Sequence, residues 1–270
     1  MSVPVVFIHF GHGEYLPYVF DQAKRWAEEV IVVGDSANTA RTTPVEDLSQ
    51  DIAEFTKTYE HLSTNGHSIE LFCMTRWLVL RNLMRARNIT TCLYLDSDVL
   101  LFSNPTEDWN TFDLFDFTLV HWSSGHTSFW TLKGIEKFCY FMLNLYRNKS
   151  SYDWDKISSH YHIRQKHGLG GGVCDMTLLE YYGRQQGGYV GEMMQIRRGR
   201  PEVTSTYDHV ISLPDQGFAM RDDHKDIRFI QNAPWVPLPD KNLMVRFKSL
   251  HCQGPSKHLI PRLFKEATNV

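Results

Sequence analysis

The sequence has few cysteines, no long apolar run and no excess of charge of one sign, and each absence excludes a class of protein. The five cysteines lie far apart, and no C-x-x-C pair of the kind that binds zinc is present. Isolated thiols in odd number indicate reduced side chains in a reducing compartment. No apolar run reaches the roughly 18 residues that span a bilayer, and no basic leader precedes the first apolar segment. We therefore expect a soluble, cytoplasmic protein without an integral membrane segment.

The balance of charge excludes proteins whose surface attracts polyanions. The formal net charge is −3, from 28 basic and 31 acidic residues. Binding to nucleic acid requires an excess of Lys and Arg, so no nucleic-acid partner is expected. The basic cluster of Arg197, Arg198 and Arg200 is more typical of a solvated loop than of a phosphate contact.

Apolar periodicity predicts an α/β fold with a mostly parallel central sheet flanked by helices. Residues 3–10 and 29–33 are apolar runs typical of buried strands, and residues 16–30 between them have helical spacing. This length suits a parallel β-α-β unit. Further segments are a helix over 68–87, strands over 91–95, 99–102 and 116–122, helices over 135–146 and 173–182, and one strand near 244–250. With no internal repeat or linker, the pattern predicts a single domain over residues 1–270.

Two carboxylates, Asp96 and Asp98, directly follow the apolar run that ends at Leu95. Parallel sheets bind ligands at the carboxyl ends of their strands, and side chains two apart in an extended segment point the same way. Two like charges at the edge of an apolar sheet repel each other, and a divalent cation removes that penalty. Mg²⁺ and Mn²⁺ prefer carboxylate and phosphate oxygens, so the pair predicts a metal–diphosphate site. The alternative is a turn with solvated carboxylates.

A second motif, His-Cys-Gln-Gly-Pro-Ser-Lys over residues 251–257, follows the predicted strand near the C-terminus. His251 can supply an imidazole nitrogen to a metal. Gly254 lets a phosphate approach the backbone closely, and Lys257 can neutralise a phosphate charge. The alternative is a surface loop with an unrelated histidine.

Together, the β-α-β start, the L-Y-L-D-S-D motif and the H-x-x-G-x-x-K motif resemble the GT-A fold glycosyltransferases, which have a Rossmann-like fold. They are most similar to family 8, the glycogenin and lipopolysaccharide galactosyltransferase group. The resemblance implies that Asp96, Asp98 and His251 bind Mn²⁺ or Mg²⁺. It implies that Asp96 also contacts the ribose of the donor and that Lys257 holds the donor diphosphate. Residues of about 1–121 then form the nucleotide-binding half, and residues of about 122–270 the acceptor-side half.

The resemblance also suggests roles for five residues outside the two motifs. Arg76 is the candidate donor-binding arginine, with an ordinary surface arginine as the alternative. Asp175, after the glycine-rich run 168–172, is the candidate catalytic residue, an acidic side chain near the donor sugar and acceptor, or else it caps the following helix. Asp35 contacts uracil or ribose, or forms a turn. His126 and Ser128 correspond to positions beside the donor sugar.

His160, His162 and His167 lie in a polar stretch without the H-E-x-x-H spacing of a zinc enzyme, so we expect an acceptor-side loop there. The sequence as a whole predicts a metal-dependent hexosyltransferase that moves a sugar from a nucleotide-sugar, with UDP as the expected nucleotide, to a hydroxyl of a carbohydrate or glycan acceptor, with retention of configuration. One alternative is a sugar nucleotidyltransferase, although the first glycine loop lacks the expected Lys or Arg. The other is an inactive carbohydrate-binding scaffold.

Overall fold

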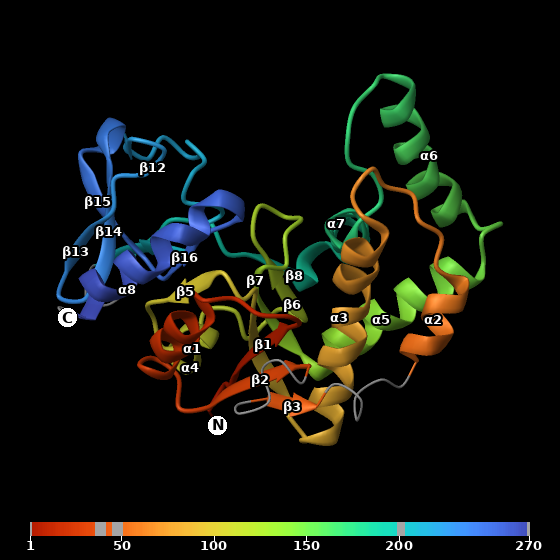
Figure 1. Ribbon diagram of the computed structural model, residues 1–270, viewed down its shortest axis with the longest axis horizontal. Coiled ribbons are helices and arrows are strands. Elements are labelled where there is room, and N and C mark those ends of the chain that lie inside the picture. The colour runs from red at the N-terminus through yellow and green to blue at the C-terminus, as the bar shows by residue number, and fades with distance from the viewer. Residues whose placement is uncertain (1, 36–41, 45–50, 199–202, 269–270) are drawn as a thin grey trace.

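The computed structural model describes residues 2–35, 42–44, 51–198 and 203–268, so Arg200 lies outside the described residues. A seven-stranded sheet with the order β3-β2-β1-β4-β7-β6-β8 forms the centre of the fold (Figure 1). Its strands are β1 (Val5–His9), β2 (Val30–Gly34), β3 (Thr42–Pro44), β4 (Thr91–Leu95), β6 (Phe117–Leu119), β7 (Thr127–Thr131) and β8 (Val190–Glu192). Neighbouring strands are parallel except where β7 pairs with β4 and β6. The mostly parallel sheet expected from the sequence is therefore confirmed.

Helices cover both faces of this sheet, which explains why its strands are apolar on both sides. Val6 and Ile8 face a core shared with α3, α5 and α7, whereas Val5 and Phe7 face a second core shared with α1 and α8. The helices are α1 (Leu16–Lys24), α2 (Ile52–Thr58), α3 (His67–Ala86), α4 (Pro105–Trp109), α5 (Leu132–Arg147), α6 (Tyr152–Lys166), α7 (Asp175–Gln186) and α8 (Ile260–Thr268). None of the helices in the part of the chain that the structure describes combines the length and apolarity needed to cross a bilayer.

The C-terminal third contains more strand than its sequence indicates. A five-stranded sheet with the order β13-β14-β15-β10-β9 lies beside the central sheet and α8 (Figure 1). The strand expected near residues 244–250 is two strands that belong to different sheets, interrupted at Lys248. The additional strands are β5 (Val99–Leu101), β9 (Arg197–Arg198), β10 (Thr204–Thr206), β11 (Met220–Arg221), β12 (His224–Lys225), β13 (Arg228–Ile230), β14 (Ala233–Leu238), β15 (Leu243–Phe247) and β16 (Ser249–His251).

Two polar segments expected to be loops are regular structure. The histidine-rich stretch forms α6, which begins at the N-cap Ser151 and projects from the body of the fold (Figure 1). His160, His162 and His167 are exposed on it or at its end. Arg197 lies in β9 with its guanidinium 4.9 Å from the centre of the Phe112 ring, so this part of the basic cluster is not a solvated loop.

Candidate metal centre

The carboxyl ends of six parallel strands meet at one edge of the central sheet. Strands β1, β2, β3, β4, β6 and β8 all run in the same direction, because β4 and β6 are both antiparallel to β7. At this edge lie His9, Asp35 and Asp96 from the first half of the chain and Glu192 from the second. Open α/β sheets bind ligands at such an edge.

Asp96, Asp98 and His251 offer ligand atoms that all lie within 4.8 Å of one another. Backbone pairing explains how residues this far apart in sequence meet. Asp98 immediately precedes β5, which pairs antiparallel with β16 so that Val99 lies opposite His251. The Cys252 amide then donates a hydrogen bond to the Asp98 carbonyl oxygen at 2.9 Å. The pairing of β5 with β16 therefore joins the two sequence motifs into one group.

The imidazole of His251 is oriented as a metal ligand requires. Its Nδ1 lies 2.6 Å from the His209 carbonyl oxygen, which can only accept a hydrogen bond, so Nδ1 carries the proton. Its Nε2 lies 3.4 Å from Asp98 Oδ1. A ligating histidine typically donates its other ring N–H to a backbone carbonyl in this way. Two carboxylates and one such imidazole fit a hard divalent cation, and this is the one group of three potential ligands found among the described residues.

Lys257 brings a positive charge to the same group. Its Nζ lies 3.3 Å from Asp98 Oδ2 and 5.5 Å from the centre of the Tyr15 ring, while its side chain remains 39% exposed. Burial disfavours the charge on Asp98, but contacts with His251 and Lys257 outweigh it and hold the pKa of Asp98 below its ordinary value. Burial likewise opposes protonation of His251, and its contact with Asp98 outweighs that and raises its pKa.

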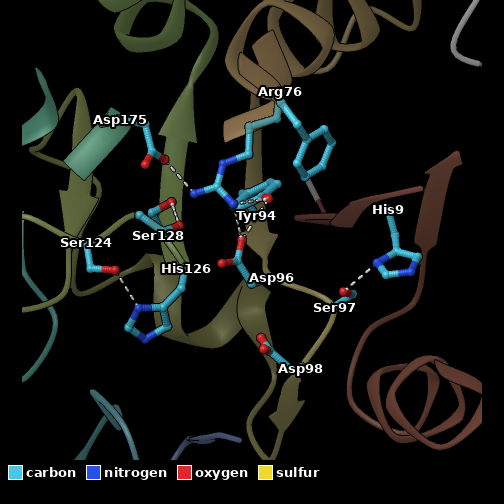
Figure 2. A network of polar contacts seen from close by, with 12 residues as sticks. His9, Arg76, Tyr94, Asp96, Ser97, Asp98, Ser124, His126, Ser128 and Asp175 are labelled. Atoms are coloured by element: carbon cyan, nitrogen blue, oxygen red, sulfur yellow. Dashed lines mark hydrogen bonds and ion pairs between the residues drawn. The ribbon is translucent and has the colours of Figure 1, made fainter. Parts of the chain in front are cut away.

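Arg76 links the metal group to Asp175, as Figure 2 shows. Its Nη1 lies 2.6 Å from Asp96 Oδ1 and its Nη2 lies 2.5 Å from Asp175 Oδ2. The Tyr94 hydroxyl donates to the same oxygen of Asp96 at 2.8 Å. Burial opposes the charge on Arg76, but the two carboxylates outweigh it and keep its pKa well above the ordinary value. The buried guanidinium is therefore not the ordinary surface arginine considered as an alternative.

Asp175 is the first residue of α7 and is 3% exposed. Its Oδ1 accepts a hydrogen bond from the Met176 amide, and its Oδ2 accepts one from the Trp77 indole at 3.2 Å in addition to Arg76. The N-cap of the helix is Cys174, so capping is not the main role of Asp175. The glycine run before it is pinned at Gly172, where an added Cβ would lie 2.1 Å from the Leu62 carbonyl oxygen.

His126 and Ser128 are both buried, and His126 contacts the metal group through His251. The His126 ring stacks on His251 with centroids 3.9 Å apart, and its nitrogens contact Ser124 Oγ at 2.7 Å and the Asp208 carbonyl oxygen at 3.2 Å. Burial and the nearby His251 hold its pKa well below the ordinary value, so the ring is neutral. Ser128 is fully buried and donates to the Gly125 carbonyl oxygen.

Asp35 follows β2 and Gly254 lies shortly after β16, in backbone segments next to the ligand edge of the sheet. The Asp35 carboxylate accepts a hydrogen bond from the Gly11 amide at 2.9 Å and so joins the loops that follow β1 and β2. His9 Nδ1 lies 2.8 Å from Ser97 Oγ, which ties the first loop to the aspartate turn (Figure 2). Gly254 has a φ of +58°, and an added Cβ would meet nothing within 4 Å. The backbone there is open to a close ligand approach.

A buried ion pair supports His251 and was not foreseen from the sequence. Asp208 Oδ2 accepts a hydrogen bond from the His251 amide at 2.9 Å, and its Oδ1 lies 2.9 Å from Lys225 Nζ. Lys225 also lies 2.9 Å from Asp215 Oδ1, and its side chain is fully buried. Burial raises the pKa of Asp208 against the pull of Lys225. The three charged residues come from segments that the sequence marks only as loop, so no pattern could have indicated them.

Comparison with known proteins shows the fold. No protein-family model and no curated protein sequence matches the chain. The structure of the WbbM bifunctional glycosyltransferase covers 100% of this chain with a TM-score of 0.51 at 12% identity, and the chain spans 50% of that protein. The galactosyltransferase LgtC, solved with donor and acceptor sugar analogues, matches 99% of this chain and 96% of its own at 15% identity and a TM-score of 0.47.

Mouse xyloside xylosyltransferase 1 covers 71% of this chain and 85% of its own, with 11% identity and a TM-score of 0.48. The WbbM likeness extends over the whole chain. The chain therefore has the GT-A fold expected from its sequence.

Proposed function

We propose that the protein is a metal-dependent glycosyltransferase that moves a sugar from a nucleotide-sugar, with UDP as the nucleotide, to a hydroxyl of a carbohydrate or glycan acceptor. The observation that carries the proposal is the group of Asp96, Asp98 and His251 at the ligand edge of the sheet, with Lys257 3.3 Å from Asp98. Two carboxylates and an imidazole beside a partly exposed ammonium group suit a divalent cation that is shared with a diphosphate.

The three residues would hold Mn²⁺ or Mg²⁺. When bound, the ion would supply positive charge to the diphosphate as it departs from the sugar. Lys257 faces the same diphosphate, because its half-exposed ammonium group can turn from Asp98 toward an incoming phosphate. Gly254 lets the phosphate approach the backbone. Together these groups stabilise the charge that grows on the leaving group.

Arg76 and Asp175 orient the site instead of binding phosphate directly in this proposal. The Arg76 guanidinium fixes Asp96 Oδ1, which leaves Asp96 Oδ2 for the metal and the ribose. Asp175, on the other side of the same guanidinium, provides negative charge near the donor sugar, where positive charge develops. His126 stacks on the His251 ring and keeps it in place, and Ser128, two residues further along the chain, is fully buried.

The two halves of the domain divide the substrates. Residues of about 1–121 carry Asp35 and the aspartate pair, and we assign the nucleotide to this half, with Asp35 near the ribose or the base. Residues of about 122–270 carry the C-terminal motif and the acceptor side. The Asp35 carboxylate on the Gly11 amide disfavours the nucleotidyltransferase alternative, because such an enzyme binds phosphate on this loop and a carboxylate repels it.

Calorimetry with UDP in the presence of Mn²⁺ tests the proposal. Asp98→Asn keeps the shape of the side chain and removes one metal ligand, so the fold should persist while metal-dependent UDP binding is lost. The control is Asp240→Asn, which changes an exposed carboxylate far along the chain in a 3-10 turn. Equal UDP affinity in wild type and Asp98→Asn, or full affinity in EDTA, would refute the metal role.

Release of free UDP from UDP-sugars separates turnover from binding. A wild-type protein that binds UDP with Mn²⁺ but releases none from any UDP-hexose, with or without glycan acceptors, is the inactive scaffold. Release that depends on Mn²⁺ and on Asp98 supports the transferase.

A further inference from the structure

The turn between β6 and β7 presents an exposed tryptophan at the ligand edge of the sheet. Val120 and Ser124 pair through two backbone hydrogen bonds, each 2.9 Å long, and close a loop of three residues that begins with His121 and Trp122. Trp122 is 54% exposed. Strand β6 ends at the same edge as β4, so this turn lies on the side of the sheet that holds the metal group (Figure 1).

The backbone of this turn is held in an unfavourable conformation. His121 and Trp122 have φ angles of +54° and +59°, values that glycine or asparagine normally supplies in tight hairpin turns. Since Trp122 remains more than half exposed, burial of its own ring does not offset this strain. A strained backbone that displays an unburied aromatic ring at a ligand edge is typical of a binding residue.

A buried carboxylate compensates the strain. Glu192 is 6% exposed, and its Oε1 accepts a hydrogen bond from the His121 amide at 3.0 Å while its Oε2 accepts one from the Trp122 amide at 2.7 Å. Glu192 reaches them because β8 is parallel to β6, with Leu119 opposite Glu192. Oε1 also accepts from the Met194 amide at 2.8 Å. The carboxylate thus holds the turn through bonds to its backbone alone, which leaves the indole free.

The turn connects directly to the metal group. The His121 ring stacks on His209 with centroids 5.2 Å apart, and the His209 carbonyl oxygen is the partner of His251 Nδ1. Ser124, at the end of the turn, contacts His126, which stacks on His251. A ring bound on Trp122 would therefore lie beside the group that activates the donor.

We propose that Trp122, positioned by Glu192, forms a subsite for one pyranose ring of the acceptor. This inference rests on the proposed glycosyltransferase function. The apolar face of a pyranose packs against an indole, while its hydroxyl groups stay in water or reach the polar edge of the site. Stacking fixes the orientation of the ring, and orientation of the acceptor hydroxyl lowers the barrier to transfer.

Fluorine NMR of protein labelled with fluorotryptophan tests the subsite. The chain has seven tryptophans, and the resonance that is missing in Trp122→Phe identifies Trp122. Methyl pyranosides of glucose, galactose, mannose and xylose, and disaccharides of these sugars, are titrated into the protein with Mn²⁺ and UDP. At least one of them should shift the Trp122 resonance and leave the other six unchanged. Trp122→Ala should weaken that sugar about 10-fold or more, the loss expected for one aromatic contact.

Two variants control the experiment. Glu192→Gln keeps one carbonyl oxygen and replaces the other with an amide group that cannot accept, so it should weaken the sugar and move the Trp122 resonance without changing UDP affinity. Tyr140→Ala removes an aromatic ring on α5 that is even more exposed than Trp122, and it should change neither the sugar affinity nor the Trp122 resonance. The proposal is wrong if no pyranoside shifts Trp122 while Mn²⁺-dependent UDP binding is intact, or if UDP alone shifts it, since Trp122 would then contact the nucleotide. If the wild type does not bind UDP but a pyranoside still shifts the Trp122 resonance, the proposed function is wrong and the sugar subsite is supported.

Discussion

The Arg76 guanidinium and the Asp175 carboxylate lie 2.5 Å apart, and both side chains are less than a tenth exposed. The same guanidinium binds Asp96 at 2.6 Å, so one buried cation joins a proposed metal ligand to the residue assigned to the sugar. A buried cation held between two carboxylates fixes both of them, because moving either one leaves charge without a partner. A substitution at Asp175 should therefore also alter how Asp96 is held.

Asp175→Asn is expected to lower turnover more than donor binding. The amide can still accept the hydrogen bond from Arg76 but no longer provides negative charge near the sugar, where positive charge grows in the transition state. Steady-state kinetics with a UDP-sugar should show a fall in kcat of roughly 10²-fold or more with a smaller change in KM. The control is Asp153→Asn. In the wild type, the Asp153 carboxylate likewise accepts a side-chain hydrogen bond, from the Tyr181 hydroxyl at 2.7 Å. An equal loss in both variants, or a change in KM alone, would contradict the role.

His251→Ala and Lys257→Ala should separate metal binding from diphosphate binding. Removal of the imidazole should weaken Mn²⁺ roughly 10-fold or more, by analogy with the effect of supporting residues at other metal sites. Removal of the ammonium group should leave the affinities for Mn²⁺ and uridine nearly unchanged and lower the affinity for UDP. Calorimetric titrations with Mn²⁺, uridine and UDP measure each effect. Identical profiles for the two variants would show that the two side chains do not have distinct ligands.

Lys225→Met should destabilise the protein and weaken metal binding, although Lys225 does not touch the metal group. The variant leaves Asp208 buried without its cation, which costs about 3 kcal/mol or more in the free energy of unfolding. Without Lys225, Asp208 holds the His251 amide less firmly. Urea denaturation and Mn²⁺ titration measure the two effects. The double variant Lys225→Met with Asp208→Asn should recover part of both, because the fully buried charge is gone and only the partly exposed Asp215 still lacks its cation. A double variant worse than the single one would contradict this.

The aspartate motif could be predicted from the sequence because its signal is local. Asp96 follows a buried strand of five residues, and the end of such a strand in a parallel sheet is a ligand edge whatever the rest of the chain does. Strands β1, β2, β4 and β6 of the central sheet and helix α3 followed from the same periodicity, whereas β3, β7 and β8 did not. Asp98 and His251 lie side by side because β5 pairs with β16. The spacing of residues within either motif does not show this pairing.

The second sheet could not be predicted, because β9, β10 and β13 have only two or three residues each and the pairing that joins β10 to β15 links distant segments. β10 has three residues and pairs with β15, about forty residues later. Strand β7 was also not among the predicted elements, although its sequence, Thr-Ser-Phe-Trp-Thr, has the β-branched and aromatic residues of a strand. Lys225 and Asp208 are charged residues that the sequence places at the surface, and only their mutual pairing makes burial possible.

The stereochemical outcome of the reaction is the last prediction. An inverting enzyme needs a carboxylate with a free lone pair within reach of the acceptor hydroxyl. Asp175 is the acidic residue assigned to the sugar, and its oxygens already accept hydrogen bonds from Arg76, Trp77 and Met176. A carboxylate held by these three donors cannot turn toward an acceptor hydroxyl without breaking them. In a retaining reaction the departing phosphate can take the proton of the acceptor, and no free base is required.

We therefore expect retention, with an α-linked product formed from an α-linked UDP-sugar. Proton NMR of the first-formed glycoside distinguishes the two anomers. Under retention, Asp175→Asn should still give the α-linked product at a reduced rate, because Asp175 stabilises charge and does not transfer the proton. A β-linked product from the wild type would overturn retention. It would also require Asp175 to leave Arg76 during the reaction, and Asp175→Asn would then abolish transfer while leaving UDP binding intact.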